Sequence, residues 1–338
     1  MRQHAVLIFG SMKHVSILVP RGAAALGCIE GSFILFNKAN DFLEMRGKPP
    51  LFQVQLVGLT GDPQQYDRPF SVRPDVPIDK VRRTDLVIIP AVNGDMGKVI
   101  EANKGFFPWI TQQYKAGAEV ASLCVGAFLL AATGLLKGRH CATHWLSADD
   151  FRRRFPDVSL VSESIITDEN GIYSSGGAHS FWNLLLYLLE KYTDREIAIY
   201  ASKFYEIEID RDRQSPFLIF QGQKDHSDGA VRKAQDHIEA NYRERLTVDG
   251  LCGLLAVGRR SLERRFKHAT GNTVSVYIQR VRIESAKKSL ETSRKNVTEV
   301  MYEAGYSDSK AFRTVFRRIA GMSPLDYRSR YNRETISA

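Results

Sequence analysis

The chain has 338 residues, of which 43% are hydrophobic, which suffices for ordinary cores in two domains. Its apolar runs are too short to span a membrane and its N-terminus does not resemble a secretion signal, so we expect a cytoplasmic protein. The four cysteines form no CxxC pair, which argues against a zinc site or a disulfide framework, and we expect no metal and no cofactor.

The net charge of +9 lies entirely in the last third of the chain. Residues 228–338 hold 22 Lys and Arg against 13 Asp and Glu, whereas residues 1–227 hold 25 of each kind. A basic domain joined to a neutral one favours a polyanionic partner, although a solvated basic surface with no such partner is the alternative.

Strand-like and helix-like segments alternate along the first two-thirds of the sequence. Apolar runs rich in β-branched residues predict strands, and apolar residues three and four positions apart predict helices. This gives strands over 14–20, 52–59, 84–92 and 119–125, helices over 29–43, 106–117, 126–136 and 179–192, and a hairpin over 162–177. Such alternation predicts an α/β domain with a mostly parallel sheet covered on both faces, and ligands bind such sheets beyond the carboxyl ends of the strands.

Cys124 lies at one of these strand ends, where the pattern predicts a sharp turn into a helix. An exposed thiol on a strained strand-to-helix turn is well placed for a nucleophile. A buried cysteine that packs as a small apolar side chain would occupy the same position equally well. The residue therefore marks either a catalyst or the remnant of one.

The last third of the sequence contains two similar phrases, over 246–278 and 296–328. Each predicts a short helix, a Gly-containing turn and a second helix with apolar residues at i and i+4, and a long helix over 274–293 joins the phrases. Two helix-turn-helix units on one spacer helix are a DNA-reading architecture. We interpret 13–210 as the α/β domain, 211–229 as a linker and 230–333 as an all-α DNA-binding domain.

Each second helix is predicted to enter a major groove, with the two helices about 34 Å apart on one face of B-DNA. Arginine can bridge guanine or phosphate, and glutamate can accept from cytosine. The candidate DNA-binding residues on the exposed faces of the two helices are Arg259, Arg260, Glu263, Arg264, Ser309, Lys310, Arg313, Thr314 and Arg317.

These phrases resemble the AraC/XylS family of transcription regulators across nearly all of residues 230–331. The stretch GRRSLERRFK (258–267) matches the first recognition helix of the family, and AGYSDSKAFRTVFRRIAGMSPLDYR (304–328) matches its most recognisable segment. The resemblance implies that Phe312 and Phe316 belong to the core and do not contact DNA. Gly258 stands where the family usually has a Ser or Thr N-cap, so we expect a slightly frayed first recognition helix.

Residues 13–210 resemble the PfpI-type, amidotransferase-like superfamily, and more narrowly the N-terminal domain of GlxA-type regulators. The segments SLCVGAFLLAATGLLKGRHCATHW (122–145) and GIYSSGGAHSFWNLLLYLLE (171–190) carry this resemblance. It implies a flavodoxin-like α/β sandwich with Cys124 at the elbow.

The residues that would make Cys124 a working nucleophile are altered. Val125 stands where PfpI-like hydrolases have a His, Cys28 stands at the acidic position with Glu30 two residues on, and Ala91-Val92 replaces a Gly-Gly loop. His140, His144 and His179 remain as candidate bases, although a His beside a Trp is more often a packed structural residue. We therefore expect that the chain is not an enzyme.

The sequence thus predicts a one-component transcription regulator that binds double-stranded promoter DNA. Its α/β domain would form a homodimer and sense a small-molecule effector. The candidate pocket residues are Cys28, Glu30, Asn93, Gly94, Cys124, Val125 and His144. Two alternatives remain: an active thiol amidase or deglycase fused to a DNA-binding domain, and a redox sensor that works through oxidation of Cys124.

Overall fold

A computed structural model describes residues 12–66, 70–209 and 214–332. The chain divides between Gln214 and Ser215 into two compact units, residues 1–214 and 215–338. This boundary falls inside the segment 211–229 that the sequence marks as a linker. Residues 210–213 and 333, which carry part of that linker and two predicted domain ends, lie outside the described residues.

The first unit is built on a seven-stranded sheet with the strand order β12-β13-β9-β7-β1-β3-β6. All neighbouring strands run parallel except β12, which pairs antiparallel with β13 as the predicted hairpin. The strands are β1 (Lys13–Val19), β3 (Phe52–Gly58), β6 (Val76–Pro77), β7 (Leu86–Ile89), β9 (Glu119–Ser122), β12 (Ile166–Asp168) and β13 (Ile172–Ser175). The flavodoxin-like α/β fold expected from the sequence is confirmed.

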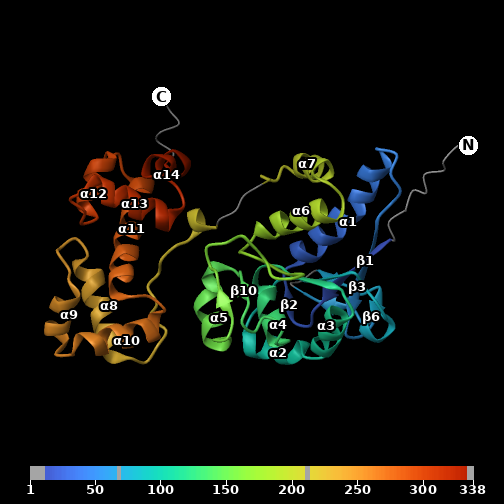
Figure 1. Cartoon of the computed structure of the whole chain (residues 1–338), viewed down its shortest axis with the longest axis horizontal. Coiled ribbons are helices and arrows are strands. Elements are labelled where there is room, and N and C mark those ends of the chain that lie inside the picture. Colours follow the sequence, from blue (N-terminus) through green and yellow to red (C-terminus); the bar gives the residue numbers. More distant parts are fainter. Residues whose placement is uncertain (1–11, 67–69, 210–213, 333–338) are drawn as a thin grey trace, which may run out of the picture. The chain divides into compact units, whose positions relative to one another are not determined.

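Helices cover both faces of this sheet (Figure 1). On one face lie α1 (Leu26–Glu44), α6 (Ser180–Tyr192) and α7 (Arg195–Phe204), and on the other lie α2 (Met96–Asn103), α3 (Phe106–Lys115) and α4 (Ala127–Ala132). Buried leucines on α6 and buried aromatic and aliphatic residues on α1 face the apolar strands and form one continuous core. A further helix, α5 (Ala148–Arg154), follows the short strand β10 (His140–Cys141).

Two predicted elements of this unit are shorter than expected. The predicted strand 84–92 breaks at Pro90, which has no N–H for the ladder, and after the break β8 (Val92–Asn93) pairs with β2 (Ala23–Ala24). The predicted helix 126–136 ends at Ala132, and Gly134 follows with φ +81°. The strand therefore ends because of its proline and the pairing of β8 with β2, and the helix ends at a glycine turn. The apolar period of the sequence reports neither cause.

The helices α2 and α7 were not predicted from the sequence. Each bears few buried residues, and each begins where an aspartate side chain accepts backbone N–H groups, Asp95 for α2 and Asp194 for α7. Ile197, Ala198 and Ala201 of α7 are buried, so the sequence does carry an apolar period at this helix.

In the second unit, helices are the only regular elements along residues 214–332. The long helix α11 (Val274–Thr292) lies between two groups of helices (Figure 1). One group comprises α8 (Gly229–Asn241), α9 (Val248–Leu255) and α10 (Arg259–Thr270), and the other comprises α12 (Val297–Glu303), α13 (Ser309–Ala320) and α14 (Pro324–Tyr331). The pairs α9–α10 and α12–α13 are the two predicted helix-turn-helix units.

Each half of this unit has its own hydrophobic core, and α11 contributes to both. Its first part supplies Val274 and Tyr277 to the core that contains Phe266, and its second part supplies Ile283 and Leu290 to the core that contains Phe316. Among the described residues, no helix is long and apolar enough to cross a membrane.

The segment 215–228 packs along the second unit, and we call it the strap. Its first turn, η4 (Ser215–Phe217), contacts α13, and its Phe220 stacks edge-on against Tyr277 of α11. A buried ion pair of α11 holds the middle of the strap, because Lys287 donates to the Leu218 carbonyl and Glu284 accepts the Phe220 N–H at 3.1 Å. The segment that composition marks as a linker is therefore docked over its described part.

Candidate nucleic-acid interface and the Cys124 site

Cys124 occupies the strained turn that the sequence predicts. Its φ is +54°, a left-handed conformation that is costly for a residue with a Cβ, and it opens the turn η2 (Cys124–Gly126) between β9 and α4. A Cβ added at Gly126 would lie 2.6 Å from the carbonyl oxygens of both Ile89 and Pro90. Only glycine at this position therefore lets the elbow approach the end of β7.

Neighbouring side chains fix the elbow through its backbone. The Cys124 N–H donates to the Ser175 hydroxyl at 3.0 Å, and the Thr143 hydroxyl donates to the Cys124 carbonyl at 3.0 Å. Ser175 and Thr143 are both fully buried. Since the Cys124 N–H is already bonded to a side chain, it is not free to stabilise an oxyanion.

The thiols at this site are buried and neutral. Cys124 is 6% exposed, and burial raises the pKa of its thiol despite hydrogen bonds from the backbone of Ala178 and Val125. Cys28 lies close enough for the two thiols to interact, and burial raises the pKa of Cys28 to about 12. A cysteine needs its thiolate form to attack a substrate, so both groups are held in the unreactive form near neutral pH.

None of the three candidate histidines serves as a base for Cys124 in the described structure. His144 accepts the Leu146 N–H on Nδ1 at 3.1 Å and so caps a short helical turn, and burial lowers its pKa. His140 is exposed and pairs with Glu169 at 2.7 Å. His179 is exposed, and no described hydrogen bond joins it to the thiol.

The structure brings together only part of the predicted pocket. Cys28, Cys124 and Val125 are buried near one another, and β8, which ends at Asn93, contacts η2. Asn93 and Gly94 themselves are exposed. Glu30 is exposed on α1 and lies close enough to Tyr205 to interact with it electrostatically.

Sequence reasoning missed four residues that build the walls of this site: Ser175, Gly177, Ala178 and Gln214. A Cβ added at Gly177 would lie 2.5 Å from the His144 ring, so this glycine is required for close packing. The signal was the adjacent pair Gly176-Gly177 directly after a strand, where the backbone must approach other groups closely.

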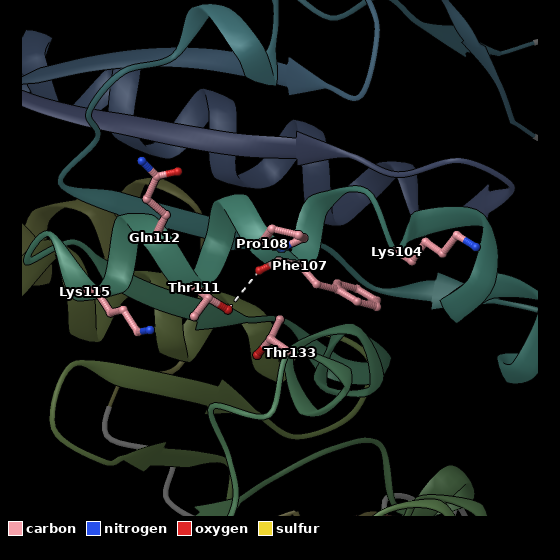
Figure 2. A pocket seen from close by; sticks show the side chains of 7 residues that line it. All are labelled: Lys104, Phe107, Pro108, Thr111, Gln112, Lys115 and Thr133. Atoms are coloured by element: carbon pink, nitrogen blue, oxygen red, sulfur yellow. Dashed lines mark hydrogen bonds between the residues drawn. The ribbon is translucent and has the colours of Figure 1, made fainter.

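An open groove lies elsewhere on this unit, along α3 and the end of α4 (Figure 2). It has a volume of about 610 Å³, and none of the seven candidate pocket residues lines it. The lining residues are Lys104, Phe107, Pro108, Thr111, Gln112, Lys115 and Thr133. Among the described residues, no cluster of three His, Cys, Asp or Glu side chains could hold a metal ion.

We expect the buried thiols to react slowly with a thiol reagent. Cys28, Cys124 and Cys141 are buried, and burial raises all three pKa values, whereas Cys252 on α9 is partly exposed. In a titration with an aromatic disulfide at pH 8, one thiol per chain should react rapidly and three only after denaturant is added. Rapid loss of a second thiol that the Cys124→Ser variant abolishes would contradict the buried, neutral state of Cys124.

All nine candidate DNA-binding residues of the second unit have exposed side chains on α10 and α13. On the opposite face of these helices, Leu262, Phe266, Phe312 and Phe316 are buried. The prediction that the two phenylalanines of α13 belong to the core is confirmed. The two helices thus each present one polar face to solvent and one apolar face to a core.

The basic residues of this surface differ in how freely they can meet a phosphate or a base. Arg259 is paired with Asp249 at 3.2 Å and with Glu263 at 3.3 Å. In the described structure, neither Arg264 nor Lys310 forms an ion pair or a hydrogen bond with a carboxylate. An unpaired Lys or Arg side chain can displace counterions from the DNA phosphates directly. A side chain that is already in an ion pair must first separate from its carboxylate partner.

The starts of the two recognition helices also differ. The Asp308 side chain caps α13 by accepting the Ala311 N–H at 2.6 Å, whereas Gly258 precedes α10 without any side-chain cap. The turn before α10 places Ala256, not a glycine, in the left-handed conformation, with φ +52°. The corresponding residue before α13 is Gly305, with φ +80°.

Comparison with known proteins matches both units. Residues 46–191 match the DJ-1/PfpI family, and residues 251–330 match a helix-turn-helix domain family. The HTH-type transcriptional regulator ArgR of Pseudomonas aeruginosa is 29% identical over 223 residues, which is 65% of this chain and 67% of that protein.

The chain is a transcription regulator that joins a DJ-1/PfpI domain to an AraC-type helix-turn-helix domain.

A second relative of this regulator is the HTH-type transcriptional regulator GbdR of Pseudomonas aeruginosa, 25% identical over 279 residues, or 82% of this chain and 75% of that protein. A solved THiJ/PfpI family protein from Pseudomonas syringae shares the fold with a TM-score of 0.50 and 16% identity, covering 69% of this chain and 88% of that one. The relatives are regulators by name, which supports a regulatory rather than an enzymatic role for the DJ-1/PfpI domain.

Proposed function

We propose that this regulator reads promoter DNA through α10 and α13, as a homodimer formed by its DJ-1/PfpI units, and that a small molecule near Cys124 controls it. The observation that carries the proposal is the pair of amphipathic recognition helices, whose nine candidate side chains are all exposed. The excess of nine positive charges in residues 228–338 supports a polyanionic partner for that surface. The proposal places the protein in the cytoplasm, because a regulator shares a compartment with its promoter.

The Cys124 site supports a sensor better than a catalyst. Its strained turn is retained, but its thiol is buried and neutral, and in the described structure its contacts come from backbone N–H groups and not from a base. An amidase would need a thiolate with a base and an oxyanion hole. A redox sensor would need an accessible thiolate, and burial opposes that as well.

The two recognition helices should both contribute to specific binding. Arg264→Ala and Lys310→Ala should each weaken binding to a DNA site selected from a random pool, by about 1–3 kcal/mol if the contact is to a base edge. Fluorescence anisotropy with labelled duplex, at several salt concentrations, measures both the affinity and the number of counterions released.

The control for this pair is Lys115→Ala, which removes an exposed lysine of the DJ-1/PfpI unit. Its affinity for the same duplex should match that of the parent. If all three variants lose affinity equally, the effect comes from general charge, and the assignment of α10 and α13 as the reading helices is wrong.

A further inference from the structure

The two halves of the DNA-binding unit meet at a polar junction beside the middle of α11. Arg282 lies on this helix between Ile278, which is buried in the first core, and Ile283, which is buried in the second. The Arg282 side chain is itself partly buried. Because α11 runs through both cores, a residue at its middle is placed to contact both halves at once.

On one side, Arg282 holds the end of α8 in the first half. Its Nε donates to the Tyr242 carbonyl at 2.8 Å, and its Nη2 donates to the Glu244 carbonyl at 2.7 Å. Tyr242 is the C-terminal cap of α8, and the carbonyl groups at such a helix end carry partial negative charge. Ser285, almost one turn further along α11, donates its hydroxyl to the Tyr242 hydroxyl at 2.8 Å. The arginine fork therefore fixes the first half to α11 through two directed bonds.

On the other side, Arg282 contacts the turn between α12 and α13. Its guanidinium carbon lies 5.4 Å from the centroid of the Tyr306 ring, a cation–π contact. Tyr306 in turn packs against Phe312 of α13, with the ring centroids 5.4 Å apart. The turn also approaches the first half directly, because a Cβ added at Gly305 would lie 2.8 Å from the Tyr242 carbonyl oxygen. One arginine thus contacts both the end of α8 and the turn that leads into the second recognition helix.

A second side chain ties the recognition helix of the second half to the same part of α11. Arg318 of α13 donates to the side-chain oxygen of Gln279, which lies almost one turn before Arg282. The position of α13 relative to the first half is therefore set by side-chain contacts on both sides of Arg282, as well as by the continuous helix.

We propose that Arg282 is the positioning residue that fixes the distance and the angle between the two recognition helices, so that the protein discriminates DNA sites by their internal spacing. The inference rests on the proposed function in one respect, that α10 and α13 both read DNA. Two helices held rigidly must find their two DNA segments at one spacing. One additional base pair between the segments moves the second by about 3.4 Å along the duplex and about 34° around it.

The distance distribution between two spin labels tests this geometry without DNA. Cysteines introduced at His268 of α10 and Ser329 of α14 carry the labels, because both positions are exposed and one lies in each half. Cys252 is replaced by serine, and the other three cysteines are buried. The labelled full-length protein is diluted in an excess of unlabelled protein, so that the electron–electron dipolar signal reports distances within one chain.

Arg282→Met should broaden this distance distribution, because it removes the two bonds to the end of α8 and the charge over Tyr306. Arg282→Lys keeps the charge but not the fork, so its distribution should be intermediate. The matched control is Lys288→Met, which removes a positive charge from an exposed position of the same helix and should leave the distribution unchanged. If Arg282→Met unfolds the unit in circular dichroism, Ser285→Ala replaces it and should give a smaller broadening.

Binding to DNA of altered spacing tests the consequence for recognition. Hydroxyl-radical footprints of the parent, Arg264→Ala and Lys310→Ala on a selected duplex assign one segment to α10 and the other to α13. One base pair is then inserted between the two segments. The parent and Lys288→Met should bind the altered duplex about tenfold more weakly than the selected one. Arg282→Met should bind the two duplexes with similar affinity.

Two results would overturn the proposal. One is a distance distribution of the same width in Arg282→Met and Lys288→Met, and the other is an undiminished preference of Arg282→Met for the selected spacing. A footprint from which Arg264→Ala or Lys310→Ala removes no segment refutes instead the proposed reading by both helices. The label distances then still decide whether Arg282 fixes the geometry of the unit.

Discussion

Phe316→Ala should unfold the second half of the DNA-binding unit while the first half remains folded. Phe316 is fully buried, and its ring packs against those of Phe312 and Tyr327 at centroid distances of 5.7 and 5.6 Å. Deleting a buried aromatic side chain costs about 3–5 kcal/mol. Because the two halves have separate cores, the loss should be confined to α12, α13 and α14. Hydrogen exchange resolved by peptide measures this.

Phe266→Ala is the matched control for this prediction. Phe266 is equally buried, in the other core, where its ring packs against Tyr277 at 5.2 Å. It should release α8, α9 and α10 and spare the second half. If both variants expose the whole unit to the same degree, the two cores unfold as one cooperative block and the division into halves is only geometric.

Gly126→Ala should destabilise the DJ-1/PfpI unit severely. Gly126 has a helical φ of −57°, so alanine is tolerated by the backbone itself, but its methyl group would lie 2.6 Å from the carbonyl oxygens of Ile89 and Pro90 at the end of β7. Backbone atoms cannot move aside as a flexible side chain can, so the cost should reach the upper end of the about 1–3 kcal/mol that is typical of overpacking. The midpoint of urea unfolding, followed by tryptophan fluorescence, reports the change.

Gly27→Ala separates this clash from the general effect of replacing a glycine. Gly27 lies in the first turn of α1, and a Cβ there would meet nothing within 4 Å. Alanine should leave the unfolding midpoint unchanged or raise it slightly, since it lowers the entropy of the unfolded chain. If both variants lower the urea midpoint by a similar amount, the contact with the two carbonyl oxygens adds no cost of its own. The elbow would then be able to move away from β7.

Much of the fold was readable from the sequence because the signals are local. The alternation of apolar runs and helical periods gave the parallel sheet and its covering helices, and the repeated phrases gave both helix-turn-helix units with Phe312 and Phe316 inside. Cys124 was placed on a strained turn from its position between a strand and a helix, and its φ of +54° confirms that turn.

The contacts that the sequence did not reveal join residues far apart in the chain. Gln214 bonds Ser162 and Thr143, which lie 52 and 71 residues away, so neither composition nor periodicity could show that this residue of the predicted linker is packed in the wall of the first unit. The pairing of Arg259 with Asp249 is similar, since it needs the angle between α9 and α10. Glu30 is likewise a pocket residue only by prediction, and on α1 its side chain is exposed whereas Cys28 is buried.

The shared helix α11 fixes the rotation of the two helix-turn-helix units relative to one another. Its residues up to Ile278 belong to one core and those from Ile283 onward to the other, and the helix runs unbroken between them. An α-helix turns about 100° and rises about 1.5 Å per residue. One residue inserted in the middle of α11 would therefore rotate one helix-turn-helix unit by about 100° relative to the other, while both stay folded. The length of α11 therefore fixes how the two helix-turn-helix units are rotated relative to one another.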